Sequence, residues 1–507
     1  MDKPTMHMLS VQEKRGNTRK GTQYLAAVAA SIGAIIGGTF LAWTSPAKAH
    51  LVPPAPNTTV VNGTLNNTGI NIDIVNLINI SDLNSTVLIN SLHQPADFLL
   101  TTTEFSLVSS ILAIGAAIAA IPVGISAQSI GRRPTILNLA IPFTISWLLT
   151  IFANGAGMLI AARFFAGLGT GGICVAAPMY MGEIGETSIR GTLGAFFQLF
   201  LTVGILFVYI VGGWTHWKTM SIACAIFPPL MVAVFWWMPE TPQFLLSKNR
   251  RRDAEKSLRW LRGPDADLSV ELEEMQKEVD DAARQKAGIL SMVTSPGPRM
   301  ALICGLGLMF FQQFSGINAV IFYTTDIFKS AGSKIPQEIS TVVVGIVQTF
   351  ATYLSSVLVD KAGRRLLLLQ SCLIMGICLI ALGVYFKLQA VGYAVSSFGW
   401  LPLVCMVLFI ISFSMGFGPI PWMMMAELFP VEFRGGATGI TVVTNWILVF
   451  VVTLCFPIMK DAIGIYSCFW FFACLMIACV FFVFFLIPET KGKTVSQIQA
   501  ILAGNRG

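Results

Sequence analysis

Twelve long apolar segments limit what this chain can fold into more than any other feature of its sequence. Each is about 20 residues long, the length that an α-helix needs to cross the hydrocarbon core of a bilayer. Only 12% of the residues are charged, whereas a soluble protein carries about a quarter. The segments are residues 22–44, 102–125, 134–153, 157–181, 190–212, 218–238, 300–325, 338–360, 366–387, 399–426, 436–459 and 464–487. This pattern predicts an all-α polytopic membrane protein.

The Lys and Arg residues are distributed unevenly among the loops that join these segments. They gather at residues 13–20, 131–133, 247–262, 361–365 and 491–493, while the alternate loops hold almost no arginine. Loops rich in Lys and Arg usually face the cytoplasm. We therefore expect both termini to be cytoplasmic. The net charge of +7 follows from this asymmetry, and we expect no nucleic-acid partner.

Two polar stretches interrupt the apolar pattern. Residues 239–299 combine many charges with apolar residues at helical spacing, which predicts short amphipathic helices on the cytoplasmic face. Residues 45–101 form a loop that we place outside the cell, where asparagines in N-x-S/T sequences can be glycosylated. The chain then divides into a cytoplasmic N-terminus (1–21), a first bundle (22–238), an insert (239–299), a second bundle (300–487) and a cytoplasmic tail (488–507). The five acceptor asparagines are Asn57, Asn62, Asn66, Asn79 and Asn84.

Three motifs of the first half recur in the second half in the same order. "IGRRP" with Gly131 is matched by "AGRRL" with Gly363, 363 − 131 = 232 residues later. "GEIGETSIRG" is matched by "AELFPVEFRG" at an offset of 244, and "MPETPQF" by "IPETKGK" at an offset of 249. Parallel repeats of six helices are common in transporters, with the substrate held at the bilayer midplane between them.

Uncharged polar residues interrupt the seventh segment, "FFQQFSGINAVIFYTT". Gln312, Gln313 and Asn318 lie in mid-helix, where an amide without partners costs roughly 2–7 kcal/mol in hydrocarbon. They must face other helices or a wet cavity, so they are either interhelical hydrogen-bond partners or a binding site for a neutral, hydroxyl-rich ligand. We favour the binding site, and we expect Ser315-Gly316 to bend the helix. Further candidates on the same grounds are Gln198 and Asn445, and the prolines of "GFGPIPW" mark a second hinge. Trp422 at the end of that motif is either a ring that stacks on the ligand or an ordinary packing or interface tryptophan.

Charged residues gather at the cytoplasmic ends of the segments, at matching places in the two halves. They are either topology-setting charges, since exposed pairs contribute little each, or an inner gate. We favour the gate, in which ion pairs bridge the two halves and close the inner mouth. The candidates are Arg132, Arg133, Glu183, Arg190, Glu240, Asp360, Arg364, Arg365, Glu427, Arg434 and Glu489.

The segments lack the titratable groups that proton coupling usually needs. Residues 22–44 contain no Asp or Glu, no histidine lies in mid-segment, and Arg163 has no acidic partner in the first segment. This points to passive transport without a cofactor or metal. All ten cysteines fall inside the segments, so no disulfide framework is expected.

At these motifs the chain resembles the sugar porter family of the major facilitator superfamily. The resemblance rests on "GRRP", "ARFFAGLGTGG", "GEIGETSIRG", "PETPQF", "QQFSGINAVIFYT", "DKAGRR", "GPIPW" and "PETKGKT", and it covers the chain except for residues 45–101 and the extreme termini. The sequence is similar to insect facilitated trehalose transporters and, more distantly, to animal facilitative glucose transporters. The resemblance implies twelve helices in two pseudo-symmetric six-helix bundles that carry trehalose or a hexose such as glucose across the plasma membrane by alternating access.

The resemblance also implies roles for single residues. Phe322 and Tyr323 correspond to outer-gate aromatic residues, and Gln348 stands where glucose transporters typically carry a sugar-binding Asn. The residues that it places in contact with the sugar are Gln198, Gln312, Gln313, Asn318, Trp422 and Asn445.

Three alternatives remain open. A proton–sugar symporter would use Glu104 or Asp326 near the outer helix ends. A sugar sensor would bind without transporting, but such proteins usually add a long signalling tail. A membrane-embedded enzyme would need a catalytic motif such as HExxH or G-x-S-x-G, which the sequence lacks. We expect a monomer that works in the lipid bilayer.

Overall fold

The computed structural model describes residues 19–52, 98–186, 189–284, 293–321, 327, 336–393, 395–493 and 495–504. Within these ranges the chain is helical and contains no strand, and twelve helical segments are long and apolar enough to cross a membrane. The predicted all-α class and the twelve spans are therefore confirmed. The acceptor asparagines Asn57, Asn62, Asn66, Asn79 and Asn84 lie outside the described residues, as do Phe322, Tyr323 and Asp326.

The first half consists of six spans, some of them built from two consecutive helices. The first span continues past the expected loop boundary at residue 45 and ends at Leu51, because Pro46 lies in the first turn of its second helix, where no backbone donor is lost. The helices are α2 (Gly21–Ala42), α3 (Thr44–Leu51), α5 (Thr102–Ser129), α6 (Arg132–Asn138), α7 (Ala140–Ile151), α8 (Ala156–Ile184), α9 (Arg190–Trp214), α10 (Trp217–Cys224) and α11 (Phe227–Phe235).

The second half repeats this arrangement after the insert. The insert itself is helical, as expected, and consists of α12 (Pro242–Ser247), α13 (Arg251–Arg262) and α14 (Ser269–Arg284). The helices of the second half and the tail are α16 (Pro296–Gln313), α18 (Gln337–Ala362), α19 (Arg364–Val391), α20 (Leu401–Met415), α21 (Ile420–Leu428), α22 (Val431–Ile463), α23 (Ile465–Leu486) and α24 (Val495–Leu502).

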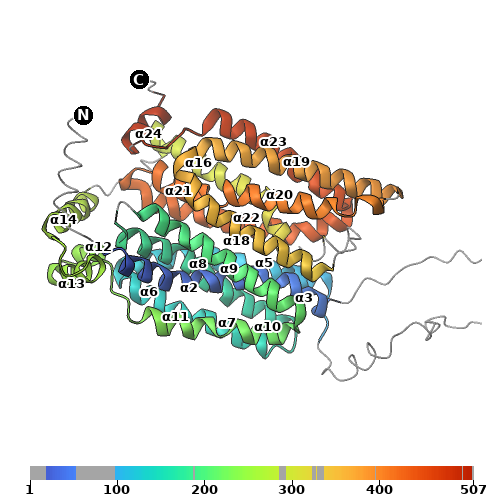
Figure 1. The fold of residues 1–507 in the computed structure, drawn as a ribbon, viewed down its shortest axis with the longest axis horizontal. Coiled ribbons are helices and arrows are strands. Elements are labelled where there is room, and N and C mark those ends of the chain that lie inside the picture. The colour runs from blue at the N-terminus through green and yellow to red at the C-terminus, as the bar shows by residue number, and fades with distance from the viewer. Residues whose placement is uncertain are drawn as a thin grey trace, which may run out of the picture.

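The two halves lie side by side along the length of the molecule (Figure 1). They meet where α5 packs against α22 and α9 packs against α18. The insert and α24 lie at the same end, and the backbone N–H of Arg19 donates to the carbonyl oxygen of Arg262 there. The first described residue, the insert and the tail helix therefore share one end of the bundle, as an even number of spans requires.

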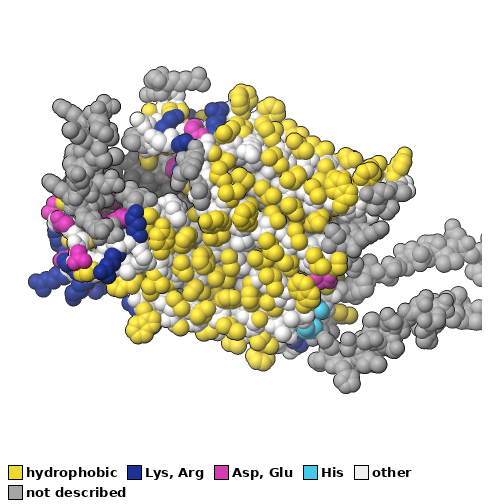
Figure 2. Space-filling model, viewed as in Figure 1, with side chains coloured by type: hydrophobic (Ala, Val, Ile, Leu, Met, Phe, Trp, Pro, Cys, Tyr) yellow, Lys and Arg dark blue, Asp and Glu magenta, His cyan; other side chains and the backbone are white. Residues whose placement is uncertain are grey.

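Close packing inside each half depends on small residues at helix crossings. A Cβ atom on Gly167 of α8 would overlap the carbonyl oxygen of Leu112 on α5, and one on Gly38 of α2 would overlap that of Leu201 on α9. Glycines at such crossings let membrane helices approach backbone to backbone. Figure 2 shows the complementary outer surface, where apolar side chains cover the flank of the bundle and charged side chains gather at the end that carries the insert.

Candidate functional site

Helix α16 breaks where the sequence predicts a bend. It ends at Gln313, and the chain turns through Phe314 to Gly316 before helical structure resumes at residues 317–321. Gly316 has φ +86°, a left-handed conformation that glycine adopts without strain. The Ser315 hydroxyl donates to the carbonyl oxygen of Gln312 at 2.7 Å and so satisfies one of the acceptors that the break frees. The break places polar side chains and free backbone groups in the middle of the bundle.

A second break faces the first one. Helix α20 ends at Met415 and α21 begins at Ile420, because Pro419 and Pro421 cannot donate to a continuous helix. The carbonyl oxygens of Phe417 and Gly418 are therefore free. Nε2 of Gln312 donates to them, at 2.7 Å and 3.1 Å. A single amide thus joins the two broken spans.

The other predicted amides extend this contact into a chain of hydrogen bonds. Nδ2 of Asn445, on α22, donates to Oε1 of Gln312 at 2.9 Å. Nε2 of Gln313 donates to the same oxygen at 3.3 Å, and Asn318 donates to Oε1 of Gln313. Gln312, Gln313 and Asn445 are buried. The structure therefore brings four predicted site residues into one network, in which they bond to protein groups and to one another.

A narrow cavity lies next to this network, between the two halves. Gln198 of α9 lines it from the first half, and Thr352, Ser355, Pro419 and Met423 line it from the second half. Its volume is about 10 Å³, far below the roughly 300–1,000 Å³ of most small-molecule sites, so in this conformation the space between the halves is nearly closed. Pro419 directly follows Gly418, whose carbonyl accepts from Gln312. The cavity therefore touches the segment that holds the amide network.

Gln348 lies one helical turn from this cavity on α18. The hydroxyl of Thr352, which lines the cavity, donates to the backbone carbonyl of Gln348 at 2.8 Å. The side chain of Gln348 is buried, and its Oε1 has no hydrogen-bond partner among the described residues. An unpaired buried acceptor costs about 1–3 kcal/mol. Trp422 lies on α21 close in sequence to Pro419, which lines the cavity, and it is half-buried against the core.

Towards the end of the bundle opposite the insert, the two halves contact each other through Tyr209 and the broken seventh span. The hydroxyl of Tyr209, on α9, donates to the carbonyl oxygen of Ile321 at 3.1 Å. Ile321 ends the short helical stretch that follows the break in α16. Leu206 and Tyr209 also pack against Gly345 of α18. The two halves are therefore in contact on the side of the network that faces away from the insert.

Arg163 is fully buried without a carboxylate partner in the described part of the chain. Its Nη1 donates to the carbonyl oxygen of Phe40 at 2.7 Å, and its Nε to that of Val108 at 3.4 Å. The guanidinium lies 5.6 Å from the ring centroid of Trp43. Glu104 accepts from the backbone N–H and the hydroxyl of Thr101 at the start of α5, both at 2.9 Å. This carboxylate therefore completes a helix cap.

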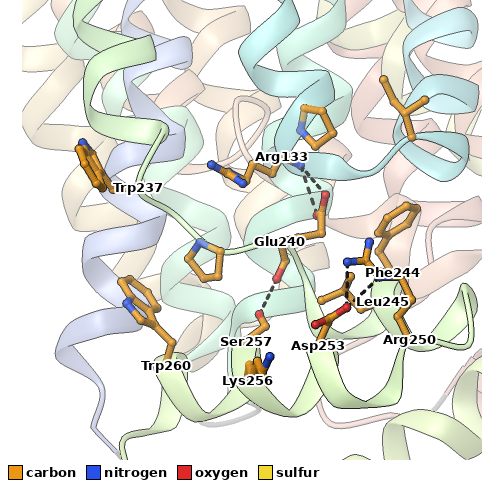
Figure 3. Close-up of a pocket in the computed structure, with 13 residues that line it drawn as sticks. Arg133, Trp237, Glu240, Phe244, Leu245, Arg250, Asp253, Lys256, Ser257 and Trp260 are labelled. Atoms are coloured by element: carbon orange, nitrogen blue, oxygen red, sulfur yellow. Dashed lines mark hydrogen bonds and ion pairs between the residues drawn. The ribbon is translucent and has the colours of Figure 1, made fainter.

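The charged motif of the first half forms a compact cluster at the insert end. Arg132 and Glu183 form an ion pair of 2.7 Å, and the hydroxyl of Thr241 donates to the second Glu183 oxygen at 2.6 Å. The carboxylate of Glu240 accepts from the backbone N–H group of Arg132 at 3.1 Å. It also accepts from that of Arg133 at 3.2 Å (Figure 3). Gly131, with φ +115°, turns the chain so that both N–H groups point the same way.

The second half reproduces this cluster with equivalent residues. Arg364 and Glu427 form an ion pair of 3.1 Å, and Thr490 donates to the other Glu427 oxygen at 2.5 Å. Glu489 accepts from the backbone N–H groups of Arg364 and Arg365, at 3.0 Å and 3.1 Å. The predicted repeat of the two halves therefore extends to individual hydrogen bonds.

Equivalent carboxylates differ in their pKa. Burial raises the pKa of Glu240 above its ordinary value, although the backbone N–H groups of Thr241, Arg133 and Arg132 act against it. For Glu489, burial is also the largest single influence and raises the pKa. Backbone N–H donors from Lys491, Arg364, Arg365 and Thr490 together outweigh it and hold the pKa of Glu489 below its ordinary value.

Comparison with known proteins identifies the family. The family model described as "Sugar (and other) transporter" matches residues 57–502 of the chain. The chain belongs to the sugar transporter family. It is 37% identical over 484 residues to the facilitated trehalose transporter Tret1 of Drosophila mojavensis. The aligned region covers 95% of this chain and 52% of that protein. The trehalose transporter 1 of Drosophila melanogaster shows the same identity and coverage. The chain thus spans about half the length of these relatives.

Solved structures of other transporters share the fold of this family member. The proton:xylose symporter XylE, of the major facilitator superfamily, superposes with a TM-score of 0.72 at 24% identity, covering 95% of this chain and 99% of XylE. A partially occluded, inward-open form of XylE from E. coli gives a TM-score of 0.71 at 23% identity, with 93% and 99% coverage. The predicted fold of two six-helix bundles is therefore confirmed.

The structure describes how some of the charged residues of this family member pair. We expected ion pairs that bridge the halves; two described ion pairs of this set lie within one half each, and the bridging gate stays a prediction. Arg132–Glu183 lies within the first half and Arg364–Glu427 within the second, because each arginine directly follows a glycine turn that aims it at its own bundle. For the helical residues Arg190, Asp360 and Arg434, the positions of the side chains lie outside the description.

Sequence reasoning also missed several residues that this sugar transporter family member uses at these sites. Thr241 and Thr490 complete the charged clusters, and they follow Glu240 and Glu489 in the repeated "PET" motif, so the repeat itself carried the signal. Tyr209 and Thr352 carried no signal in the sequence, since a tyrosine or a threonine in an apolar span is common. Only the packing of α9 against α18 brings them to the interface between the halves.

Proposed function

We propose that this protein is a facilitative carrier for a neutral sugar and that it works by alternating access between its two halves. The observation that carries the proposal is the meeting of two broken helices at a buried network of uncharged amides, beside a cavity lined by both halves. Uncharged donors and acceptors suit a ligand rich in hydroxyl groups. Broken helices in a membrane are tolerated where they line a substrate pathway.

The closed network suggests how the sugar is exchanged. In the described conformation the amides satisfy one another, the cavity is small, and Tyr209 joins the halves on the side opposite the insert. When the halves rock apart at the insert end, the cavity that Gln198 lines widens towards Gln348 and the network. Sugar hydroxyl groups then take over hydrogen bonds that the amides make with one another. Because hydrogen bonds to the sugar replace hydrogen bonds within the protein, the free energies of the bound and unbound states are close to each other.

Transport down the gradient fits the surroundings of Arg163. The arginine is held by backbone carbonyl groups and an aromatic ring, and it forms no ion pair with a carboxylate of the described residues. Glu104, one of the two groups that a symporter would use, is occupied as a helix cap; Asp326 lies outside the described residues. The symporter is therefore the second candidate.

Trehalose is the first candidate substrate, and a hexose such as glucose is the second. The relatives that match over 95% of this chain are named trehalose transporters.

We place the protein in the plasma membrane as a monomer, with both termini and the insert in the cytoplasm, sequons outside, and no enzymatic activity. The clusters at Glu240 and Glu489 then rigidify the cytoplasmic end of each half, so that the halves move as units; whether Arg190, Asp360 and Arg434 add bridging pairs belongs to the same proposal.

Uptake into proteoliposomes tests this function. Purified protein should take up labelled trehalose, or labelled glucose, down a concentration gradient, and a protonophore or an imposed pH step should leave the initial rate unchanged. Uptake that rises with an inward proton gradient and collapses with the protonophore would favour the symporter. Binding of labelled sugar without uptake would favour a sensor.

The site is tested by a pair of matched glutamine variants. Gln348→Leu removes an acceptor that has no protein partner in the described residues, so the fold keeps its hydrogen bonds. Uptake should fall by about two- to tenfold, the value of one lost hydrogen bond to the sugar, without a drop in the unfolding midpoint. Gln370→Leu changes an exposed glutamine of α19 and should leave uptake unaltered. Equal uptake in the two variants removes Gln348 from the site.

A further inference from the structure

A second, larger cavity lies at the insert end of the molecule, away from the amide network. It measures about 490 Å³. Its walls come from the end of α5 and the start of α6, from the chain that follows α11, and from α12 and α13 (Figure 3). Ser257 of α13 donates to the carbonyl oxygen of Glu240 at 2.5 Å and so ties the insert to the wall above it. The cavity is therefore built by the docking of the insert onto the first half.

The side chains that line this cavity carry a net charge of +1, from Arg133, Arg250 and Lys256 against Glu240 and Asp253. Asp253 is paired with Arg250 at 2.8 Å, and the carboxylate of Glu240 is held by backbone N–H groups. Arg133 and Lys256 are the lining cations without a carboxylate partner in the described ranges, and the Arg133 side chain donates through Nη2 to the carbonyl oxygen of Trp236. Nε of Arg133 is buried and has no hydrogen-bond partner within the described ranges, and Lys256 makes no ion pair or hydrogen bond there. An anion placed between Arg133 and Lys256 would meet donors from both walls.

Two tryptophans with exposed rings line one side of the cavity. Trp237 follows the last turn of the sixth span and is 78% exposed, and Trp260 of α13 is 37% exposed. Figure 3 shows both rings on the same side of the cavity. Tryptophan is enriched where a bilayer meets water, with its ring at the level of the lipid headgroups. Lys256 and Trp260 are four residues apart on α13 and so share a face. The cavity therefore opens at the headgroup level.

We propose that this cavity binds the phosphate of an anionic phospholipid from the leaflet that faces the insert. Arg133 and Lys256 hold the phosphate, and Trp237 and Trp260 flank the glycerol backbone. Ile130 and Pro134 supply an apolar wall where the acyl chains leave. Basic pockets on the cytoplasmic side of membrane helices are suited to phospholipid headgroups. A soluble phosphate compound would satisfy the same cations, but it would make no use of an apolar wall and an exposed tryptophan beside the bilayer.

The second half shows what the insert contributes. Arg365 occupies the place of Arg133: its Nη2 donates to the carbonyl oxygen of Phe484, and its guanidinium lies 5.4 Å from that ring, as Arg133 does with Trp236 at 5.8 Å. The helix after this cluster, α24, packs instead against α16 and α21. The arginine is therefore common to both halves, whereas the lysine and the second tryptophan come from α13.

Thermal unfolding of the full-length protein in detergent tests the site, because a ligand that binds the folded state raises the unfolding midpoint. Phosphatidylserine should raise the midpoint of the unaltered protein more than phosphatidylcholine does. In Lys256→Gln the phosphatidylserine concentration that gives half of this shift should rise about fivefold, the effect of removing one surface cation. In Lys277→Gln, an exposed lysine of α14 outside the cavity, it should stay unchanged.

The outcomes separate the sources of the phosphate. Water-soluble glycerophosphoserine should give no shift; a shift as large as that of the lipid would assign the cavity to a soluble phosphate compound and overturn the lipid proposal. An equal response of Lys256→Gln and Lys277→Gln, or an equal effect of both lipids, would also overturn it. Trp237→Ala, at a ring that is 78% exposed, provides a second variant, which should weaken the response to phosphatidylserine with little change of the midpoint in its absence. The measurement reads binding and does not depend on which solute the protein carries.

Discussion

At the scale of single residues, two carboxylates with equivalent hydrogen bonds differ in their pKa. Glu240 and Glu489 accept from equivalent backbone N–H groups in their own halves. Burial dominates at Glu240 and raises its pKa, whereas at Glu489 the backbone donors outweigh burial and lower it. The difference arises because Glu240 is covered by the insert, through Ser257, while the tail after Glu489 covers its cluster less. Each carboxylate therefore contributes to stability in a different range of pH.

This difference predicts unequal effects of two equivalent substitutions on the unfolding midpoint. A carboxylate with a lowered folded-state pKa stabilises the fold above its ordinary pKa, and this stability is lost as the pH falls through the lowered value. A raised pKa has the opposite sign, with stability present at low pH and lost as the pH rises through the raised value. At neutral pH, Glu489→Gln should therefore lower the unfolding midpoint more than Glu240→Gln does. Midpoints of both variants measured across pH check this, and a larger loss for Glu240→Gln contradicts it.

At the scale of elements, the breaks in the seventh and tenth spans bring polar groups together inside the bundle. Gly316, in a left-handed conformation, and Pro419 with Pro421 interrupt hydrogen bonding at the same depth of the bundle. The freed carbonyl groups would be costly in hydrocarbon, and Gln312 satisfies two of them. The positions of both breaks could be predicted from glycine and proline, since their backbone restrictions are local. Their mutual contact could not, because it joins residues about a hundred positions apart.

The contact between α9 and the broken seventh span yields a prediction about conformation. Tyr209→Phe removes the hydrogen bond to the Ile321 carbonyl that joins the two halves towards the end opposite the insert. A hydrogen bond of this kind contributes about 0.5–1.5 kcal/mol, so the form open at that end should become more populated. A cysteine introduced by Gly213→Cys, beside Glu338 at that end, should then react faster with an impermeant maleimide.

The control for this measurement is Tyr393→Phe, which changes a tyrosine that is 67% exposed. It should leave the labelling rate of the introduced cysteine at the level of the unaltered protein. If Tyr209→Phe labels no faster than Tyr393→Phe, the Tyr209 contact does not hold that end closed.

At the scale of the whole molecule, the insert is attached to the first half by buried polar contacts. Arg262 is fully buried, pairs with Glu271 at 2.7 Å and donates to the carbonyl oxygen of Ile184 at 2.9 Å. Its own carbonyl accepts from Arg19, and the Thr22 hydroxyl donates to Leu261 at 2.8 Å. The insert therefore moves with the first half, and it brings the walls of the basic cavity with it.

Removing this attachment should free the insert without unfolding the bundle. Arg262→Met leaves Glu271 buried without its partner, which typically costs about 3–5 kcal/mol. Limited proteolysis should cut the insert faster than in the unaltered protein. Arg259→Met breaks an exposed pair with Glu255, in which both side chains are about half exposed, and should change the cutting rate little. Equal cutting rates in the two variants would contradict the proposed attachment.

The number of spans, the repeat of the two halves, the helical insert and the places where two spans break all follow from the amino-acid sequence. These features depend on the length of apolar segments and on glycine and proline, which act on the chain around them. Which group bonds to which depends instead on how the helices pack. Gln312 bonds to α22 and to the gap between α20 and α21, and each charged cluster closes within its own half. The basic cavity exists only where the insert docks. Hydrogen bonds and ion pairs act over a few ångströms, so their partners are set by how helices distant in sequence pack together.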